Sequence, residues 1–86
     1  MNTASSRNFD KQFRKLSAKV KKQFSKRLQL FFKDPNHSQL NLHKLSGKYD
    51  ELWSINITGD VRTVFDRSFP NVILFMASGP HSELYG

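Results

Sequence analysis

Residues 53–66 read WSINITGDVRTVFD, and this stretch decides the fold class. Large apolar residues at positions 53, 55 and 57 alternate with polar ones, which is the period of a strand with one face on a core. Thr58-Gly59-Asp60 forms a turn, after which positions 61, 63 and 65 share one face of a second strand and positions 62, 64 and 66 the other. The apolar run of residues 72–77 predicts a third strand, so we expect an antiparallel meander.

The residues before the meander have helical spacing. Phe9, Phe13 and Leu16 recur at i, i+4 and i+7. Ser17 is a favourable N-cap for a second amphipathic helix, which Asp34-Pro35-Asn36 ends because proline cannot continue the hydrogen-bond ladder. We expect a short edge strand at most from residues 1–8, and a loop or short extended arm that packs loosely from residues 37–50.

These elements predict the fold class and the domain organisation. Eighty-six residues make a single domain, residues 1–86. The expected fold is α+β, with two N-terminal amphipathic helices packed on one face of a small antiparallel sheet.

The positive charge is unevenly distributed. The formal net charge is +7, and ten of the fourteen basic residues lie in residues 1–33 beside a single acid, Asp10. Such a basic face attracts polyanions, which indicates nucleic acid or an acidic protein as partner. The alternative is a solvated helix surface that only keeps the protein soluble.

Several function classes are excluded by composition. The chain has no cysteine, so disulfides, thiolate zinc sites and a cysteine nucleophile are impossible. The glycines stand alone, which argues against a nucleotide cofactor, and the three histidines lack metal-pair spacing, so we expect neither cofactor nor metal. Because no apolar run approaches the roughly 20 residues of a membrane helix and residues 1–7 lack a secretion signal, we expect a cytoplasmic protein without membrane contact.

The remaining polar residues suit chemistry on a phosphodiester. RNA cleavage without metal needs a base for the 2′-hydroxyl, an acid for the 5′ leaving oxygen, and cations around the phosphorane. If Pro80 breaks the last strand and residues 81–84 form one turn, His81 and Tyr85 face the same side. The groups available are His43, Lys44, Lys48, Asp60, Arg62, His81 and Tyr85.

Each of these residues also has a structural interpretation. The histidines and lysines are then ordinary surface residues, and Arg62 pairs with Asp60 or Asp66. Trp53 alternates with isoleucines, which favours a place in the core over base stacking.

Three segments resemble the RelE/ParE toxin superfamily of bacterial toxin–antitoxin systems, most closely its YafQ-like branch. They are HKLSGKY at residues 43–49, WSINITGDVR at residues 53–62 and GPHSELYG at residues 79–86. The resemblance covers nearly the whole chain. It implies a ribosome-dependent endoribonuclease that cuts mRNA in the ribosomal A site and is held inactive by a cognate antitoxin, in a complex that binds its operator DNA.

The resemblance also implies roles for individual residues. His43 and His81 would transfer protons, Asp60 and Tyr85 would support them and orient the nucleotide, and Arg62 would hold the phosphate. The chain departs from the branch at Asn56, where a histidine is usual, and at Val61, where a tryptophan is usual; asparagine cannot transfer a proton at neutral pH. The residues expected to bind RNA are Lys19, Lys22, Lys26, Lys44, Lys48 and Asn56.

Two other functions stay open from the sequence. A ParE-like inhibitor of DNA gyrase would share the fold, although it would not need histidines at positions 43 and 81. A basic RNA-binding module without catalytic activity would share the charge.

Overall fold

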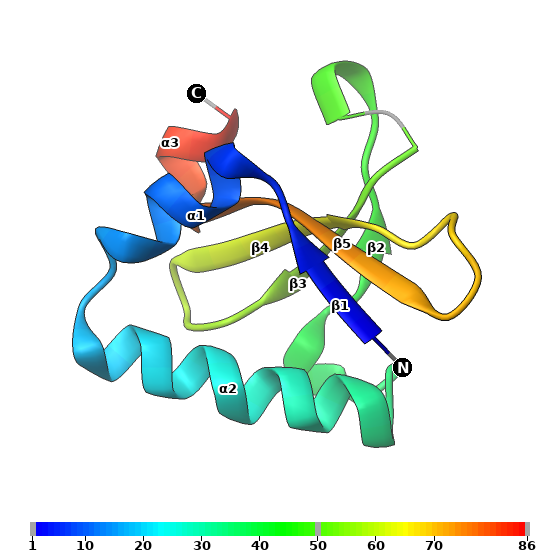
Figure 1. Ribbon diagram of the computed structural model, residues 1–86. Coiled ribbons are helices and arrows are strands. Elements are labelled where there is room, and N and C mark those ends of the chain that lie inside the picture. Colours follow the sequence, from blue (N-terminus) through cyan, green and yellow to red (C-terminus); the bar gives the residue numbers. More distant parts are fainter. Residues whose placement is uncertain (1, 50, 86) are drawn as a thin grey trace.

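A five-stranded sheet forms the centre of the molecule in the computed structural model, which describes residues 2–49 and 51–85, except the side chains of Lys48 and Tyr85 (Figure 1). Its order is β1-β5-β4-β3-β2, and β3, β4 and β5 form the predicted antiparallel meander. The strands are β1 (Asn2–Ser5), β2 (His43–Lys44), β3 (Trp53–Asn56), β4 (Val61–Asp66) and β5 (Val72–Pro80).

The first strand makes the sheet mixed, which differs from the predicted antiparallel sheet at this one edge. β1 pairs with β5 in parallel. The four side chains of β1 are exposed, so no alternation marks this strand in the sequence. Its position depends on tertiary hydrogen bonds, in which the Asn2 and Ser6 N–H groups donate to the carbonyls of Asn71 and Phe75 at 3.0 and 2.9 Å.

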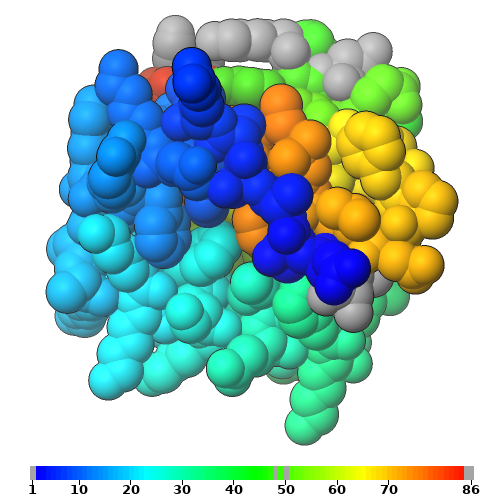
Figure 2. Space-filling model, viewed as in Figure 1, coloured from blue at the N-terminus to red at the C-terminus, as the bar shows by residue number. Residues whose placement is uncertain are grey.

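Two helices, α1 (Arg7–Arg14) and α2 (Ala18–Lys33), cover one face of the sheet, as predicted (Figure 1). The predicted N-cap Ser17 accepts the Val20 N–H at 3.2 Å, and α2 ends at Asp34. In the space-filling view, the atoms of these helices and of β1 form most of the visible surface (Figure 2). None of the helices in the described ranges has the length and apolar character that crossing a membrane requires.

The main core lies between these helices and the sheet. The rings of Phe9, Phe24 and Phe75 pack against one another with centroids 5.2 to 5.9 Å apart. Trp53 is half-buried against this cluster, as predicted. Offset and edge-to-face ring pairs add about 0.5–1.5 kcal/mol each, so this aromatic cluster stabilises the packing of the helices on the sheet. Because these helices cover one face, the opposite face is left for a site.

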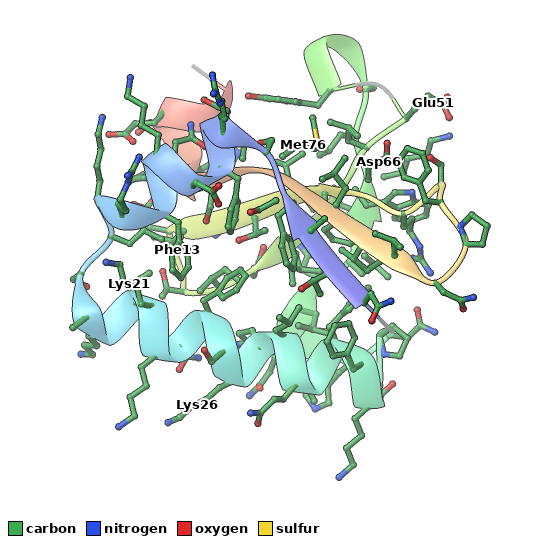
Figure 3. The ribbon with its side chains drawn as sticks, viewed as in Figure 1. Phe13, Lys21, Lys26, Glu51, Asp66 and Met76 are labelled. Atoms are coloured by element: carbon green, nitrogen blue, oxygen red, sulfur yellow. The ribbon has the colours of Figure 1, made fainter. Side chains whose placement is uncertain are left out.

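A second, smaller core lies on that opposite face. Val64 and Ala77 pack there with Leu84 of α3 (His81–Tyr85). Met76 points from β5 away from α2, toward this cluster (Figure 3). Leu84 is only 2% exposed, so the C-terminal segment is folded onto the sheet directly after Pro80.

Residues 37–49 are more ordered than predicted, and the loose packing expected of them is wrong; Asp50, the last residue of the predicted segment, lies outside the described residues. They contain two 3-10 helices, η1 (Ser38–Leu40) and η2 (Gly47–Tyr49), with β2 between them. Leu40 is fully buried, and the Arg27 guanidinium donates a 2.8 Å hydrogen bond from α2 to the Gln39 carbonyl. The order of this segment comes from a few buried contacts and from the pairing of β2 with β3. The sequence does not indicate it, because most residues of the segment are polar.

Candidate active site

The sheet face opposite α1 and α2 carries four of the predicted site residues. His43 of β2 is paired with Ser54 of β3, and Ser54 with Val64 of the second core, so His43 lies on that face. Two residues further along β3, Asn56 lies opposite Arg62 of β4. His81 follows at the start of α3, after the paired end of β5.

Two histidines from distant parts of the sequence line one cleft. His43 and His81 border a shallow depression of about 300 Å³ together with Lys44, Leu45 and Ser46. Both histidines are exposed. The cleft therefore presents two imidazole groups, which can accept or donate a proton, beside a cation.

A backbone hydrogen bond determines which nitrogen of His43 is available. His43 Nδ1 lies 2.7 Å from the carbonyl oxygen of Asn41. Because a carbonyl can only accept, Nδ1 carries the proton in the neutral ring, and Nε2 is left with the free electron pair. Nε2 can therefore take a proton from a bound group, as a general base does.

Arg62 holds the turn between β3 and β4. Its Nη1 donates to the carbonyl oxygens of Thr58 and Gly59, both at 3.1 Å. The next residue of that turn, Asp60, accepts the His81 backbone N–H on its own carbonyl at 3.0 Å. The turn thus links Arg62 to His81, because it accepts hydrogen bonds from the guanidinium on one side and from the His81 N–H on the other. The guanidinium bonds to these carbonyls and not to the carboxylates of Asp60 or Asp66, the predicted alternatives.

Asn56 has an unsatisfied acceptor. Its Oδ1 is buried and has no hydrogen-bond partner among the described residues. A buried polar atom in that state costs about 1–3 kcal/mol. Asn56 lies beside Arg62 in the strand register, so the position where the resemblance led us to expect a histidine carries an unsatisfied polar atom on the site face.

Lys44 has an acidic neighbour that the sequence did not single out. Its Nζ lies 3.5 Å from Glu51 Oε1, and both side chains are largely exposed. Such a surface ion pair contributes at most about 1 kcal/mol. A phosphate could therefore replace Glu51 as the partner of Lys44 at little cost.

Asn56, Asp60 and Arg62 do not line the cleft, and the remaining predicted residues lie outside it or have side chains that are not described. Lys19, Lys22 and Lys26 are exposed on α2, on the other side of the sheet, and Lys26 projects away from it (Figure 3). The backbone of Tyr85 belongs to α3, but its predicted orientation beside His81 falls on a side chain that is not described, as does the role of Lys48.

Sequence reasoning missed two contributors to this site, Asn41 and Glu51. Asn41 acts through its backbone carbonyl and adopts a left-handed conformation, φ 47°, so no side-chain pattern could reveal its role. Glu51 could have been suspected only as an acid near a lysine. Within the described ranges, no three His, Asp or Glu side chains gather as metal ligands would.

Comparison with solved structures identifies the fold. E. coli YafQ superposes with a TM-score of 0.82 at 13% identity, over 99% of this chain and 98% of that one. The YoeB/ParE toxin from Agrobacterium tumefaciens gives 0.76 at 15%, over 94% and 99%. A copper-bound mutant toxin from Helicobacter pylori gives 0.73 at 24%, over 99% of each chain.

YafQ has also been solved in the E. coli DinJ–YafQ complex, where it matches with a TM-score of 0.73 at 16% identity over 99% of this chain and 98% of that one. The sequence matches no family model and no curated protein. Since all these structures cover nearly the full chain, the chain has the fold of the YafQ and YoeB/ParE toxins, as the sequence resemblance predicts.

Proposed function

We propose that this chain is the toxin of a type II toxin–antitoxin system and that it cleaves mRNA on the ribosome without a catalytic metal ion. One observation carries the proposal: His43 and His81 line a single cleft with Lys44. The toxin fold supports the general class. A gyrase inhibitor of the same fold would have no use for two exposed histidines in one cleft.

The geometry favours one assignment of base and acid. His43 Nε2 removes the proton from the 2′-hydroxyl, because its Nδ1 already donates to Asn41. The 2′-oxygen then bonds to phosphorus, giving a 2′,3′-cyclic phosphate, and the bond to the 5′-oxygen breaks. The His81 imidazolium gives its proton to that 5′-oxygen, so protons and bonds balance.

Cations stabilise the charge that develops on phosphorus in this step. Lys44 lies at the cleft, and Lys48 and Arg62 are proposed to join it when RNA binds. Asp60 supports His81 by accepting its backbone N–H on the Asp60 carbonyl. Tyr85 is proposed to orient the nucleotide, and Asn56 is proposed to be a further polar group that contacts it.

The lysines of α2 have a separate role in this proposal. Lys19, Lys22 and Lys26 are exposed on the opposite side of the molecule from the cleft, where they would bind ribosomal RNA while the cleft holds mRNA in the A site. The affinity should then fall with salt, by roughly 0.7 log units per log unit of salt for each phosphate neutralised on single strands.

An antitoxin is the proposed protein partner. YafQ forms a complex with DinJ, and a chain of net charge +7 suits an acidic partner. We further propose that this complex binds its operator DNA and that the toxin acts in the cytoplasm.

The test is cleavage of mRNA on purified ribosomes, followed by primer extension and analysis of the fragment ends. A 5′-hydroxyl and a 2′,3′-cyclic phosphate, or the 3′-phosphate formed when that cyclic ester is hydrolysed, are expected after attack by the 2′-oxygen, whereas hydrolysis by a metal-activated water would not form the cyclic ester. His43→Gln and His81→Gln should each lower the rate about 10²- to 10⁴-fold.

His37→Gln is the matched control. His37 accepts the Gln39 N–H at the start of η1 and does not line the cleft, so this variant should cleave at the normal rate. Ribosome binding without cleavage by the unmodified protein would favour the non-catalytic RNA-binding module. Intact messages together with DNA damage in expressing cells would favour gyrase inhibition.

A further inference from the structure

An apolar groove lies at the end of α2, away from the cleft. Its volume is about 430 Å³, and its floor includes the buried residues Phe31 and Ile73. Phe32 and Phe69 stand at this groove with 43% and 51% of their surface exposed. Among the described residues, these are the large hydrophobic side chains that the fold leaves open to solvent.

The clustering of these two phenylalanines is informative because they come from different elements. Phe32 belongs to the last turn of α2, and Phe69 to the loop between β4 and β5. Single exposed apolar residues are ordinary, but a contiguous apolar patch around a hollow is typical of an interaction site. The groove is therefore a candidate docking surface.

The groove is also held in shape before any partner binds. The Arg67 guanidinium, which lines it, lies 5.0 Å above the Trp53 ring. The loop that carries Phe69 is tied at its start, where Asp66 Oδ1 accepts the Ser68 N–H at 2.8 Å. A preformed groove lowers the entropy lost on binding, which favours a specific partner.

Charge decides which class of partner fits. The groove is lined by one charged residue, Arg67, and a nucleic acid would need several cations along its phosphates. A second copy of this chain would bring another +7 into contact with the first. A protein segment with apolar side chains and a carboxylate satisfies both the phenylalanines and Arg67.

We propose that this groove anchors the cognate antitoxin through a segment that places an apolar side chain between Phe32 and Phe69 and a carboxylate on Arg67. This inference rests on the proposed toxin function. Phenylalanine and arginine are enriched at protein interfaces, and a few well-packed residues carry most of the binding energy, so this small surface can supply a large part of the affinity.

The anchor lies far from the histidines. The groove reaches Val72 at the start of β5, whereas His81 follows the end of that strand at Pro80. At about 3.3 Å per residue, the strand separates the two by roughly 25 Å. Antitoxin binding and RNA cleavage should therefore be separable by mutation.

The experiment uses the full chain and the antitoxin encoded by the neighbouring gene, with the dissociation constant measured by calorimetry and cleavage measured on ribosomes. Phe32→Ala, Phe69→Ala and Arg67→Gln should each weaken antitoxin binding at least tenfold. Cleavage should stay within twofold of normal. Lys11→Gln, which removes a charge that is also exposed, on α1, should change neither measurement, and thermal unfolding verifies that each variant is folded.

The outcomes separate this inference from the proposed function. Cleavage by the unmodified protein, with antitoxin affinity unchanged in both phenylalanine variants, would overturn the anchor and leave the toxin assignment standing. Loss of oligoribonucleotide binding in those variants would assign the groove to RNA, and loss of a dimer would assign it to a second copy; both results overturn the inference. If the unmodified protein neither cleaves mRNA nor binds the antitoxin, the proposed function itself fails.

Discussion

The hydrogen bonds of Arg62 lead to a quantitative prediction for the Arg62→Ala variant. The guanidinium makes two 3.1 Å bonds to the carbonyls of Thr58 and Gly59. A bond from a charged donor contributes about 1.5–3 kcal/mol. Because these bonds are longer than the usual 2.7–2.9 Å of charge-assisted pairs and Arg62 is half-exposed, we take a smaller contribution of about 1–1.5 kcal/mol for each.

The expected loss in the free energy of unfolding is therefore about 2–3 kcal/mol. For a domain of this size, 1 kcal/mol corresponds to roughly 4–8 °C in Tm, so the Tm should fall by about 10 °C or more. Total stability is of the order of 0.05–0.15 kcal/mol per residue, or about 4–13 kcal/mol. The variant should remain folded, and calorimetry can measure the change.

A second measurement locates the effect. His81 donates its backbone N–H to Asp60 in the turn that Arg62 holds, so opening of the turn should expose that amide. A loss of about 2 kcal/mol corresponds to roughly 30-fold faster hydrogen exchange, since 1.4 kcal/mol is a factor of ten. Exchange at the His81 amide can be followed by NMR.

Arg27→Ala is the matched control, because Arg27 also donates to a carbonyl, that of Gln39, but far from the turn. It should lower the Tm by a smaller amount and leave exchange at His81 unchanged. If Arg62→Ala lowers the Tm no more than Arg27→Ala and leaves the His81 amide protected, Arg62 does not hold the turn. A raised KM with unchanged exchange would leave Arg62 with its proposed phosphate-binding role alone and remove the role in holding the turn.

Three further predictions concern the same face of the sheet. Leu84→Ala should lower the free energy of unfolding by about 3 kcal/mol, because a leucine only 2% exposed leaves a cavity under α3; an unchanged denaturation midpoint would contradict the packing of α3. Glu51→Asn should bind a single-stranded oligoribonucleotide more tightly, since it removes the carboxylate paired with Lys44, and asparagine is chosen because it tolerates the left-handed φ of 71°; weaker binding in a filter assay would refute this. Asn56→Val should raise the free energy of unfolding by about 1 kcal/mol, because it removes a buried acceptor without a donor; a lower Tm would show that Asn56 Oδ1 is satisfied.

Much of the fold was predictable because its determinants are local. The alternation in residues 53–66, the cap at Ser17 and the break at Pro35 each act over a few neighbours, and the meander and both helices were predicted from them. β1 was not firmly predictable, because its exposed side chains carry no period and its partner Val72 is distant in sequence. The order of residues 37–49 was missed for a similar reason, since it depends on the burial of Leu40 against other elements.

The candidate site divides in the same way. The sequence by itself determined which groups were available, two histidines with cations, because residue type sets proton-transfer chemistry and charge. Only the tertiary structure decided that His43 and His81 share a cleft, which nitrogen of His43 is free, and that Arg62 bonds to the turn beneath His81. These features depend on cross-strand register and on hydrogen bonds to backbone carbonyls. Every residue carries the same backbone carbonyl, and only folding gives each carbonyl a particular neighbour.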